Sequence, residues 1–478
     1  MNVLSILAKQ MLYRISAFGS FSIYPTVRAL LFVKVSVFRP NFPFSPAKVP
    51  VFYGWIVLVG SVLGAIASIP GQTIGVSVFT EHLMAAMGLS RLQLANAYLA
   101  GTLISGCLLP VAGKLLDRLG VRRVAMLAAS GLGVTLMYLT ACDRFSTALS
   151  AWLTLDDTVI ATLLLVLGFV CLRFFGQGLL TMTSRTMLGK WFDRRRGQVS
   201  GIQGIFVAFG FAIAPNVFSG AIASFGWREV WRLLAIVVGI GVSGVAWLLF
   251  RDNPEMCGLR MDGEKSLAFD EKETSVEKIW GFTRREALRT LAFWAVSLAF
   301  ASQALSITGI TFNIVSIGAE MGFAEREIVD IFVPNAMVST AVGFVVGLLC
   351  DRMRLQLIFM FMMVAQAMGI AAVANLDVPV MWTLAVVGLG ISGGCFGTLT
   401  AVVLPRFFGR AHLGAIAGVQ MMIIVMASAI GPSLLASSKA VTGSYVAALY
   451  GCCLFAPVVV GLMVFVRSPA ETKASSAR

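Results

Sequence analysis

The sequence predicts an all-α membrane protein of twelve transmembrane helices in two pseudo-symmetric six-helix bundles, with both termini cytoplasmic. Three observations predict this fold: an apolar composition, a series of long uncharged segments, and an internal repeat. Of the 478 residues, 58% are hydrophobic and 13% are charged, and the mean hydropathy is +0.87. Soluble domains are roughly 45–50% apolar and about 25% charged. The chain therefore has too few polar side chains to cover a water-soluble globule.

Long apolar segments recur along the whole chain. A helix that crosses a bilayer needs about 20 apolar residues, each rising about 1.5 Å. An unpaired backbone is costly in lipid, and none of the segments alternates with period two as a barrel strand does, so all are predicted to be helices. The predicted spans are residues 53–79, 92–112, 124–142, 158–184, 199–224, 229–250, 291–316, 328–349, 355–376, 378–404, 413–437 and 442–466.

The distribution of cations predicts the orientation. With both termini cytoplasmic, 30 of the 37 Lys and Arg residues fall in inside segments, six fall in outside loops or at the outer end of a span, and Arg173 alone lies deep within a span. Such a bias is the positive-inside pattern of membrane proteins. It explains the net charge of +14 without a nucleic-acid partner.

The charged segments divide the chain into five parts. Residues 1–50 carry six cations and no acid, and are predicted to be a poorly ordered basic arm. The first bundle is predicted at 51–250 and the second at 291–467. The 251–290 segment, with nine acids and eight cations, is predicted to be a cytoplasmic linker, and 468–478 a cytoplasmic tail.

The two halves resemble one another in sequence. "GKLLDR" at 113–118 recurs as "GLLCDR" at 347–352, an offset of 234 residues. Gly197 and Gly201 fall over Gly414 and Gly418, an offset of 217. The difference corresponds to a longer connection between the third and fourth helices, at 142–157. Two six-helix units on one plan are typical of transporters whose site lies between the halves, near the midplane.

One loop motif resembles that of a known family. The loop signature between helices two and three of the major facilitator superfamily is matched by Gly113, Leu115, Asp117, Arg118, Gly120, Arg122 and Arg123. The resemblance covers residues from about 51 to 468. Within it, "LGKWFDRRRGQVSGI" and "YGW" at 53–55 resemble the monocarboxylate porter branch and its bacterial relatives, including oxalate–formate exchangers. The resemblance implies transport by rocking of two bundles, with no enzymatic activity, no ATP hydrolysis and no cofactor.

The same motif predicts a conformational latch. The carboxylate of Asp117 can accept charge-assisted bonds from Arg118, Arg122 or a helix N-terminus across the interface between the halves. In the superfamily this cluster latches the outward-facing state; simple positive-inside anchoring is the alternative. The predicted latch residues are Gly113, Asp117, Arg118, Gly120, Arg122, Arg123, Asp351 and Arg352.

Arg173 is the most specific single candidate for substrate binding. It lies 15 residues past Thr158, roughly 22 Å along a helix, where a cation costs about 2.5–3.5 kcal/mol. A guanidinium suits a bidentate carboxylate ligand, whereas a backbone carbonyl or a neutral neighbour such as Gln203 is the structural alternative. The predicted substrate-binding residues are Arg173, Gln177, Gln72, Gln303, Asn313, Asn335 and Gln420. Each of them could equally form a hydrogen bond between two helices.

The resemblance, together with Arg173, implies a secondary active transporter of small organic anions, and we expect proton-coupled monocarboxylate uptake by alternating access. Asp330, near the outer end of helix eight, is the candidate proton carrier if burial raises its pKa; a solvated interface acid is the alternative. The chain departs from animal monocarboxylate porters, since it has no lysine between Val51 and Leu83 and no arginine in helix eight.

Two other functions stay open. Gly201, Gly210 and Pro215 keep the spacing of a helix-five antiporter motif, which favours an exporter or exchanger of hydrophobic compounds. A transport-dead receptor is the other alternative, and it predicts a larger output domain than the linker provides. The expected setting is a monomer in the plasma membrane, with a bacterial inner membrane favoured, and neither a metal nor nucleic acid as partner.

Overall fold

The computed structural model describes residues 38–153, 156–263, 280–324, 327–328, 330–466 and 469. The chain divides into two compact units, residues 1–48 and 49–478. The described part of the first unit, 38–48, contains one 3-10 turn, η1 (Pro46–Lys48). Most of the predicted N-terminal arm, linker residues 264–279, and all but one residue of the predicted tail lie outside the described residues.

The second unit consists of helices. Twelve helices or helix series in its described part are long and apolar enough to cross a membrane, as the sequence predicts, and this part contains no strand. The first bundle contains α3 (Gly54–Ala67), η2 (Ile69–Gly71), α4 (Thr73–Ser77), α5 (Thr80–Met87), α6 (Arg91–Leu119), α7 (Val121–Thr140), α8 (Cys142–Leu153), α9 (Asp157–Leu172), η3 (Arg173–Leu180), α10 (Thr181–Trp191), α11 (Arg196–Phe225), α12 (Trp227–Ile236), η4 (Val237–Val242) and α13 (Ser243–Leu249).

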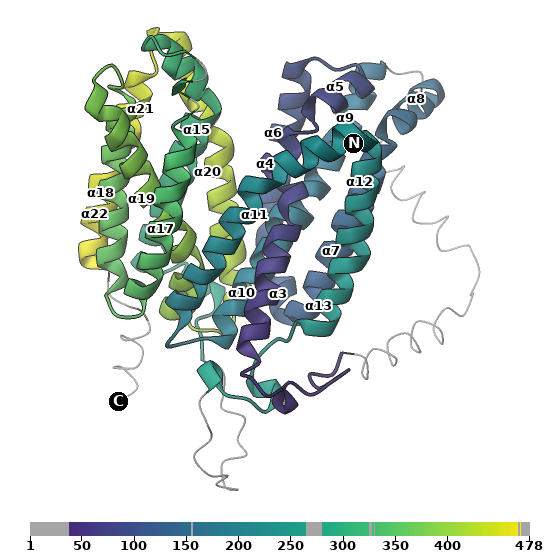
Figure 1. Ribbon diagram of the computed structural model, residues 1–478, viewed down its shortest axis with the longest axis vertical. Coiled ribbons are helices and arrows are strands. Elements are labelled where there is room, and N and C mark those ends of the chain that lie inside the picture. The colour runs from purple at the N-terminus through teal and green to yellow at the C-terminus, as the bar shows by residue number, and fades with distance from the viewer. Residues whose placement is uncertain are drawn as a thin grey trace, which may run out of the picture. The chain divides into compact units, whose positions relative to one another are not determined.

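The linker and the second bundle follow. The described linker contains η5 (Glu255–Cys257), η6 (Met261–Gly263) and α14 (Arg284–Ala287). The second bundle (green to yellow in Figure 1) contains α15 (Leu291–Glu320), α17 (Phe332–Cys350), α18 (Leu355–Val373), α19 (Pro379–Phe408), α20 (Leu413–Thr442), α21 (Val446–Cys453) and α22 (Phe455–Phe465). We call the end of both bundles at which the linker lies the linker end.

Large apolar side chains cover the outside of both bundles. Val134 and Met337 are each 70% exposed, and Phe465 is 75% exposed. So many large apolar side chains exposed on both bundles are unusual for a soluble protein, because their exposure forfeits the hydrophobic effect. The outer surface is therefore suited to lipid, in agreement with the composition.

The first predicted span, 53–79, is interrupted rather than continuous. Helix α3 ends at Ala67, a 3-10 turn containing Pro70 follows, and the backbone is extended at Gln72 before α4 begins. Proline lacks the N–H that would continue the helix ladder. The break packs against η3, a π-helix: a Cβ on Gly71 would lie 2.7 Å from Gly176 Cα. Only glycine allows the two segments to approach so closely.

The long connection at 142–157 was expected to be a loop, but it contains α8. The helix carries exposed Phe145 and Trp152 and buried Ser146 and Ser150. The insertion that shifts the repeat offset from 234 to 217 is therefore an additional short helix.

Candidate functional site

A central cavity of about 450 Å³ lies between the two bundles. Its walls come from the break after α3, η3, α10 and α11 on one side, and from α15, α17, α19 and α20 on the other. The volume is in the range of small-molecule sites, about 300–1,000 Å³. Four glutamines contribute to the polar part of the wall: Gln72, Gln177, Gln203 and Gln303.

Arg185, on α10, is the one charged side chain among the described residues that line this cavity. Within the described part of the chain it makes no hydrogen bond and no ion pair. A half-buried guanidinium without a carboxylate partner is costly. The central cavity therefore presents a single guanidinium, on its described wall, to whatever occupies it.

Arg185 was not among the predicted site residues, because the fourth span was predicted to end at residue 184. The helix continues to Trp191, which is fully buried against Tyr53 with ring centroids 5.5 Å apart. Burial raises the pKa of Tyr53 to about 12, so its phenol stays a donor to the Leu249 carbonyl (2.8 Å). The internal repeat could have predicted this longer span, because an offset of 217 aligns Arg185 with Val402, which lies inside a predicted span.

Two of the cavity glutamines join helices as well as facing the cavity. Gln72 Nε2 donates to Ser68 Oγ (3.1 Å) and Thr181 Oγ1 (3.2 Å). Gln203 Nε2 donates to Ser61 Oγ (2.5 Å). Gln177 and Gln303 line the cavity without such an interaction in the described structure. Three of the seven residues predicted for substrate binding, Gln72, Gln177 and Gln303, thus meet at one cavity.

Arg173 lies off the cavity wall, and its guanidinium faces the break in the first span. Its Nη1 donates to the carbonyl of Gly71 and to Thr73 Oγ1, both at 3.3 Å, and it lies 5.3 Å from the centre of the Tyr98 ring. Because the helix is broken here, the Gly71 carbonyl has no backbone N–H donor from the next turn. The Arg173 guanidinium supplies the missing hydrogen bond. The structure thus shows the backbone-carbonyl alternative, and the predicted substrate contact stays a prediction.

The remaining candidates lie apart from the central cavity. Asn313 Nδ2 donates to the carbonyls of Gly309 (2.9 Å) and Pro432 (3.2 Å), and Asn335 Nδ2 donates to that of Val386 (3.2 Å). These amides join helices. Asp330 is exposed just before α17, as the solvated-acid alternative predicts. Gln420 lines a smaller neighbouring pocket.

At the linker end, two aspartates bind helix N-termini of the opposite bundle. Asp117, near the end of α6, accepts from Gly414 N (2.8 Å) and Ala415 N (2.7 Å) at the start of α20. Asp351, after α17, accepts from Gly197 N (2.7 Å) and Gln198 N (2.9 Å) at the start of α11. The two contacts are related by the repeat, and both place a carboxylate at the positive end of a helix dipole.

The helices that carry these carboxylates cross at glycines. A Cβ on Gly113 would lie 2.1 Å from the Gly414 carbonyl oxygen, and one on Gly197 would lie 2.1 Å from that of Gly347. A side chain at either position would force α6 from α20, or α11 from α17. Burial raises the pKa of Asp351, and its two N–H donors oppose that rise. The two N–H donors thus favour the ionised form of Asp351, which burial disfavours.

Neither arginine that was predicted to pair with Asp117 is seen to bind it: Arg122 contacts a backbone carbonyl and Arg118 is exposed. Arg122 Nε donates to the Trp247 carbonyl (2.7 Å) within the first bundle, and Arg118 and Arg352 are exposed. Arg123 is partly buried. Gly120 (φ +84°) forms the one-residue turn between α6 and α7, whose first N–H groups are capped by Asp252. Of the partners predicted for Asp117, which were two arginines or a helix N-terminus, the structure therefore shows the helix N-terminus.

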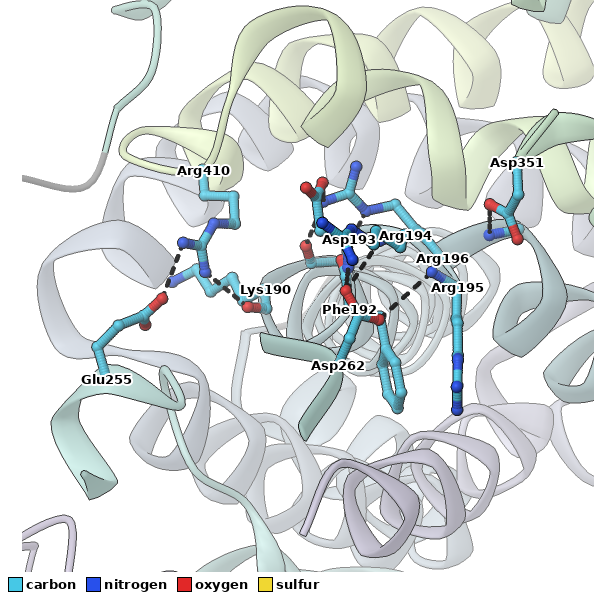
Figure 2. Close-up of polar contacts among 12 residues, drawn as sticks. Lys190, Phe192, Asp193, Arg194, Arg195, Arg196, Glu255, Asp262, Asp351 and Arg410 are labelled. Carbon is cyan, nitrogen blue, oxygen red and sulfur yellow. Dashed lines mark hydrogen bonds and ion pairs between the residues drawn. The ribbon is translucent and has the colours of Figure 1, made fainter. Parts of the chain in front are cut away.

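The linker adds a second set of contacts at this end (Figure 2). Asp262 accepts from the backbone N–H groups of Asp193 (3.0 Å), Arg194 (2.8 Å) and Arg195 (3.3 Å), in the turn before α11. Arg410, between α19 and α20, binds Glu255 of the linker (2.8 Å) and the Lys190 carbonyl of α10 (2.8 Å). Arg410 thus joins the second bundle to both the linker and the first bundle.

Twelve lipid-suited helices, two related bundles and a cavity between them define a membrane transporter. A family model described as Major Facilitator Superfamily matches residues 53–432. The chain therefore belongs to the major facilitator superfamily. Its transport function, and the absence of enzymatic function in such proteins, follow from that membership.

Solved structures of transporters share the fold at low sequence identity. The human organic anion transporter MFSD10 (TETRAN) has a TM-score of 0.58 and 12% identity, over 87% of this chain and 100% of that one. The proton:xylose symporter XylE, bound to 6-bromo-6-deoxy-D-glucose, has a TM-score of 0.59 and 14% identity, over 86% and 95%. FucP in the outward conformation has a TM-score of 0.58 and 14% identity, over 86% and 98%. Among curated protein sequences, none matches this chain.

Proposed function

We propose that this protein is a secondary transporter of small organic anions, and of monocarboxylates in particular, that works by alternating access. The observation that carries the proposal is Arg185, the one charged side chain among the described residues of the cavity wall. No carboxylate among those residues neutralises it. An incoming carboxylate would restore the missing ion pair and accept two parallel N–H bonds from the guanidinium fork.

The single cation also favours a single negative charge on the substrate. A second carboxylate would face neutral groups, since the second bundle contributes glutamine, serine, threonine, glycine and apolar side chains to the wall. Burying an unpaired charge is far more costly than burying a neutral polar group. Gln177 and Gln303 supply further hydrogen bonds on opposite walls of the cavity. One of the fold neighbours is named as an organic anion transporter, which agrees with this proposal.

The linker-end contacts are proposed to be the gate. Asp117 and Asp351 hold the two bundles together on the linker side of the cavity, so the gate must release both carboxylates before a substrate can leave there. By the cation distribution this end is cytoplasmic, and the membrane is proposed to be the plasma membrane. The state that the contacts stabilise is then the outward-facing one.

We propose that uptake is coupled to protons by one of two routes. Asp330 is exposed and lies off the cavity wall, and no carboxyl group is present on the described part of that wall. A proton would therefore travel either through Asp330 or on the substrate as its undissociated acid. Uptake measured with and without Asp330→Asn, under an imposed inward proton gradient, distinguishes the two routes.

Uptake into proteoliposomes tests the proposed substrate class. The panel is labelled acetate, lactate, pyruvate and benzoate, with succinate as a dicarboxylate, each with and without an inward proton gradient. We expect uptake of at least one monocarboxylate and a loss of about 100-fold in Arg185→Gln, since hydrogen bonds to charged groups are worth about 1.5–3 kcal/mol each. Arg232→Gln, which removes an exposed surface cation, is the matched control.

Other outcomes would overturn the proposal. Transport of the panel that is unchanged in Arg185→Gln would remove the cation from the substrate site. If no panel anion were carried, and apolar compounds were instead extruded, the chain would be an exporter of hydrophobic compounds.

A further inference from the structure

A second, smaller pocket lies beside the central cavity. It lies between α10, α19 and α20 and has a volume of about 40 Å³. Its lining includes Thr186, Ala401, Leu404, Pro405, Ala417 and Gln420, and four further lining residues also line the central cavity. Arg185 is one of those four. We call this space the inner pocket.

The inner pocket lies between the central cavity and the gate. Along α20, the cavity is lined by residues 421–428, whereas the inner pocket extends back to Leu413. Leu413 directly precedes Gly414, whose N–H binds Asp117. Just beyond the pocket, a Cβ on Gly189 would lie 3.1 Å from Pro405, so α10 and α19 close the way to the linker end.

Two polar groups without protein partners meet at this pocket. Gln420 is only 4% exposed, and its buried Nε2 has no hydrogen-bond partner in the described structure. Leaving such a group unsatisfied costs about 1–3 kcal/mol. Arg185 is likewise without an ion pair or hydrogen bond there. An amide and a guanidinium are both donors to an anion.

The size of the inner pocket restricts what can enter it. A space of about 40 Å³ holds about one or two water molecules. A carboxylate head is of that size, whereas an aryl or longer alkyl body is not. The body of a substrate would have to stay in the central cavity, which is about ten times larger.

We propose that the inner pocket is a transit subsite that receives only the carboxylate head of the transported anion, with Gln420 as its second donor. The inference rests on the proposed function. Arg185 lines both spaces, so the head passes from the cavity to the inner pocket without leaving the guanidinium. The substrate then moves head first towards the linker end, and its charge arrives next to the α20 N-terminus that Asp117 holds.

The subsite is tested by separating binding from transport. Ala417→Leu fills the inner pocket, Gln420→Leu removes the donor with little change of volume, and Ala304→Leu fills the central cavity as the matched control. Equilibrium binding and proteoliposome uptake are measured with whichever of labelled acetate, lactate, pyruvate or benzoate the wild type carries best. Thermal unfolding of each purified variant identifies any that fails to fold.

We expect Ala417→Leu and Gln420→Leu to bind the anion with a Kd within threefold of wild type and to lose at least tenfold in uptake rate. Ala304→Leu should weaken binding itself. Wild-type uptake in both inner-pocket variants would overturn the subsite, and so would equal loss of binding and uptake in folded Gln420→Leu. Uptake that requires chloride in the wild type, but not in Gln420→Leu, would assign the pocket to chloride and also overturn it. Unchanged binding in Arg185→Gln would instead refute the proposed function.

Discussion

Replacement of Asp117 by alanine tests the gate most directly. The variant removes both acceptors from the Gly414 and Ala415 N–H groups, which lie 2.8 and 2.7 Å from the carboxylate. Loss of an N-cap costs about 0.5–2 kcal/mol, and a hydrogen bond to a charged group is worth about 1.5–3 kcal/mol. Once the gate opens, water solvates the same groups, so we expect the closed arrangement to be destabilised by about 1–3 kcal/mol, which raises the ratio of open to closed protein about 5–150-fold.

The shift is measurable as a distance between the bundles. Spin labels at Lys114→Cys and Met353→Cys, in a background without the native cysteines, report the linker end of each bundle by pulsed electron resonance. An open population of about 1% in the parent would rise to about 5–60%. Asp252→Ala is the matched control, because Asp252 caps α7 within the first bundle only. If Asp117→Ala changed the distances no more than Asp252→Ala does, the gate would not depend on this carboxylate.

Two further substitutions test the helix crossing and the break in the first span. Gly113→Val should drive α6 from α20 and lower uptake at least tenfold, whereas Gly220→Val, at a glycine with nothing within 4 Å, should stay within twofold of wild type; equal uptake in the two variants would contradict the close-contact argument. Arg173→Gln should lower the thermal midpoint by several degrees and change the substrate Kd less than threefold, because its guanidinium compensates the Gly71 carbonyl. An unchanged midpoint with lost binding would instead support a substrate contact for Arg173.

The apolar composition, the long uncharged segments and the internal repeat predicted most of the fold. Twelve apolar segments are enough to locate twelve spans, because a bilayer imposes both length and composition on every helix. The internal repeat predicted two bundles from short motifs alone. The ends of the spans were less predictable: the fourth span was predicted to end at residue 184, just before Arg185, whereas α10 continues to Trp191.

The site depended on geometry that the residue pattern does not contain. Whether a mid-membrane arginine faces a ligand or the backbone is decided by its neighbours in space. Arg173 faces a carbonyl freed by the Pro70 turn, more than a hundred residues earlier, whereas Arg185 faces the cavity. Likewise, the motif predicted that Asp117 binds across the interface, but only the packing of α6 on α20 shows that its partners are backbone amides.

The two aspartate contacts between the halves are reciprocal. Each half contributes one carboxylate and one pair of backbone N–H donors, and each carboxylate accepts from the donors of the other half. Two copies of a single six-helix polypeptide, related by a two-fold axis, would make both contacts at once, as in any isologous dimer. The joint between the halves is therefore one that a half-length ancestor could already have formed with itself, before duplication and fusion gave each copy its own role.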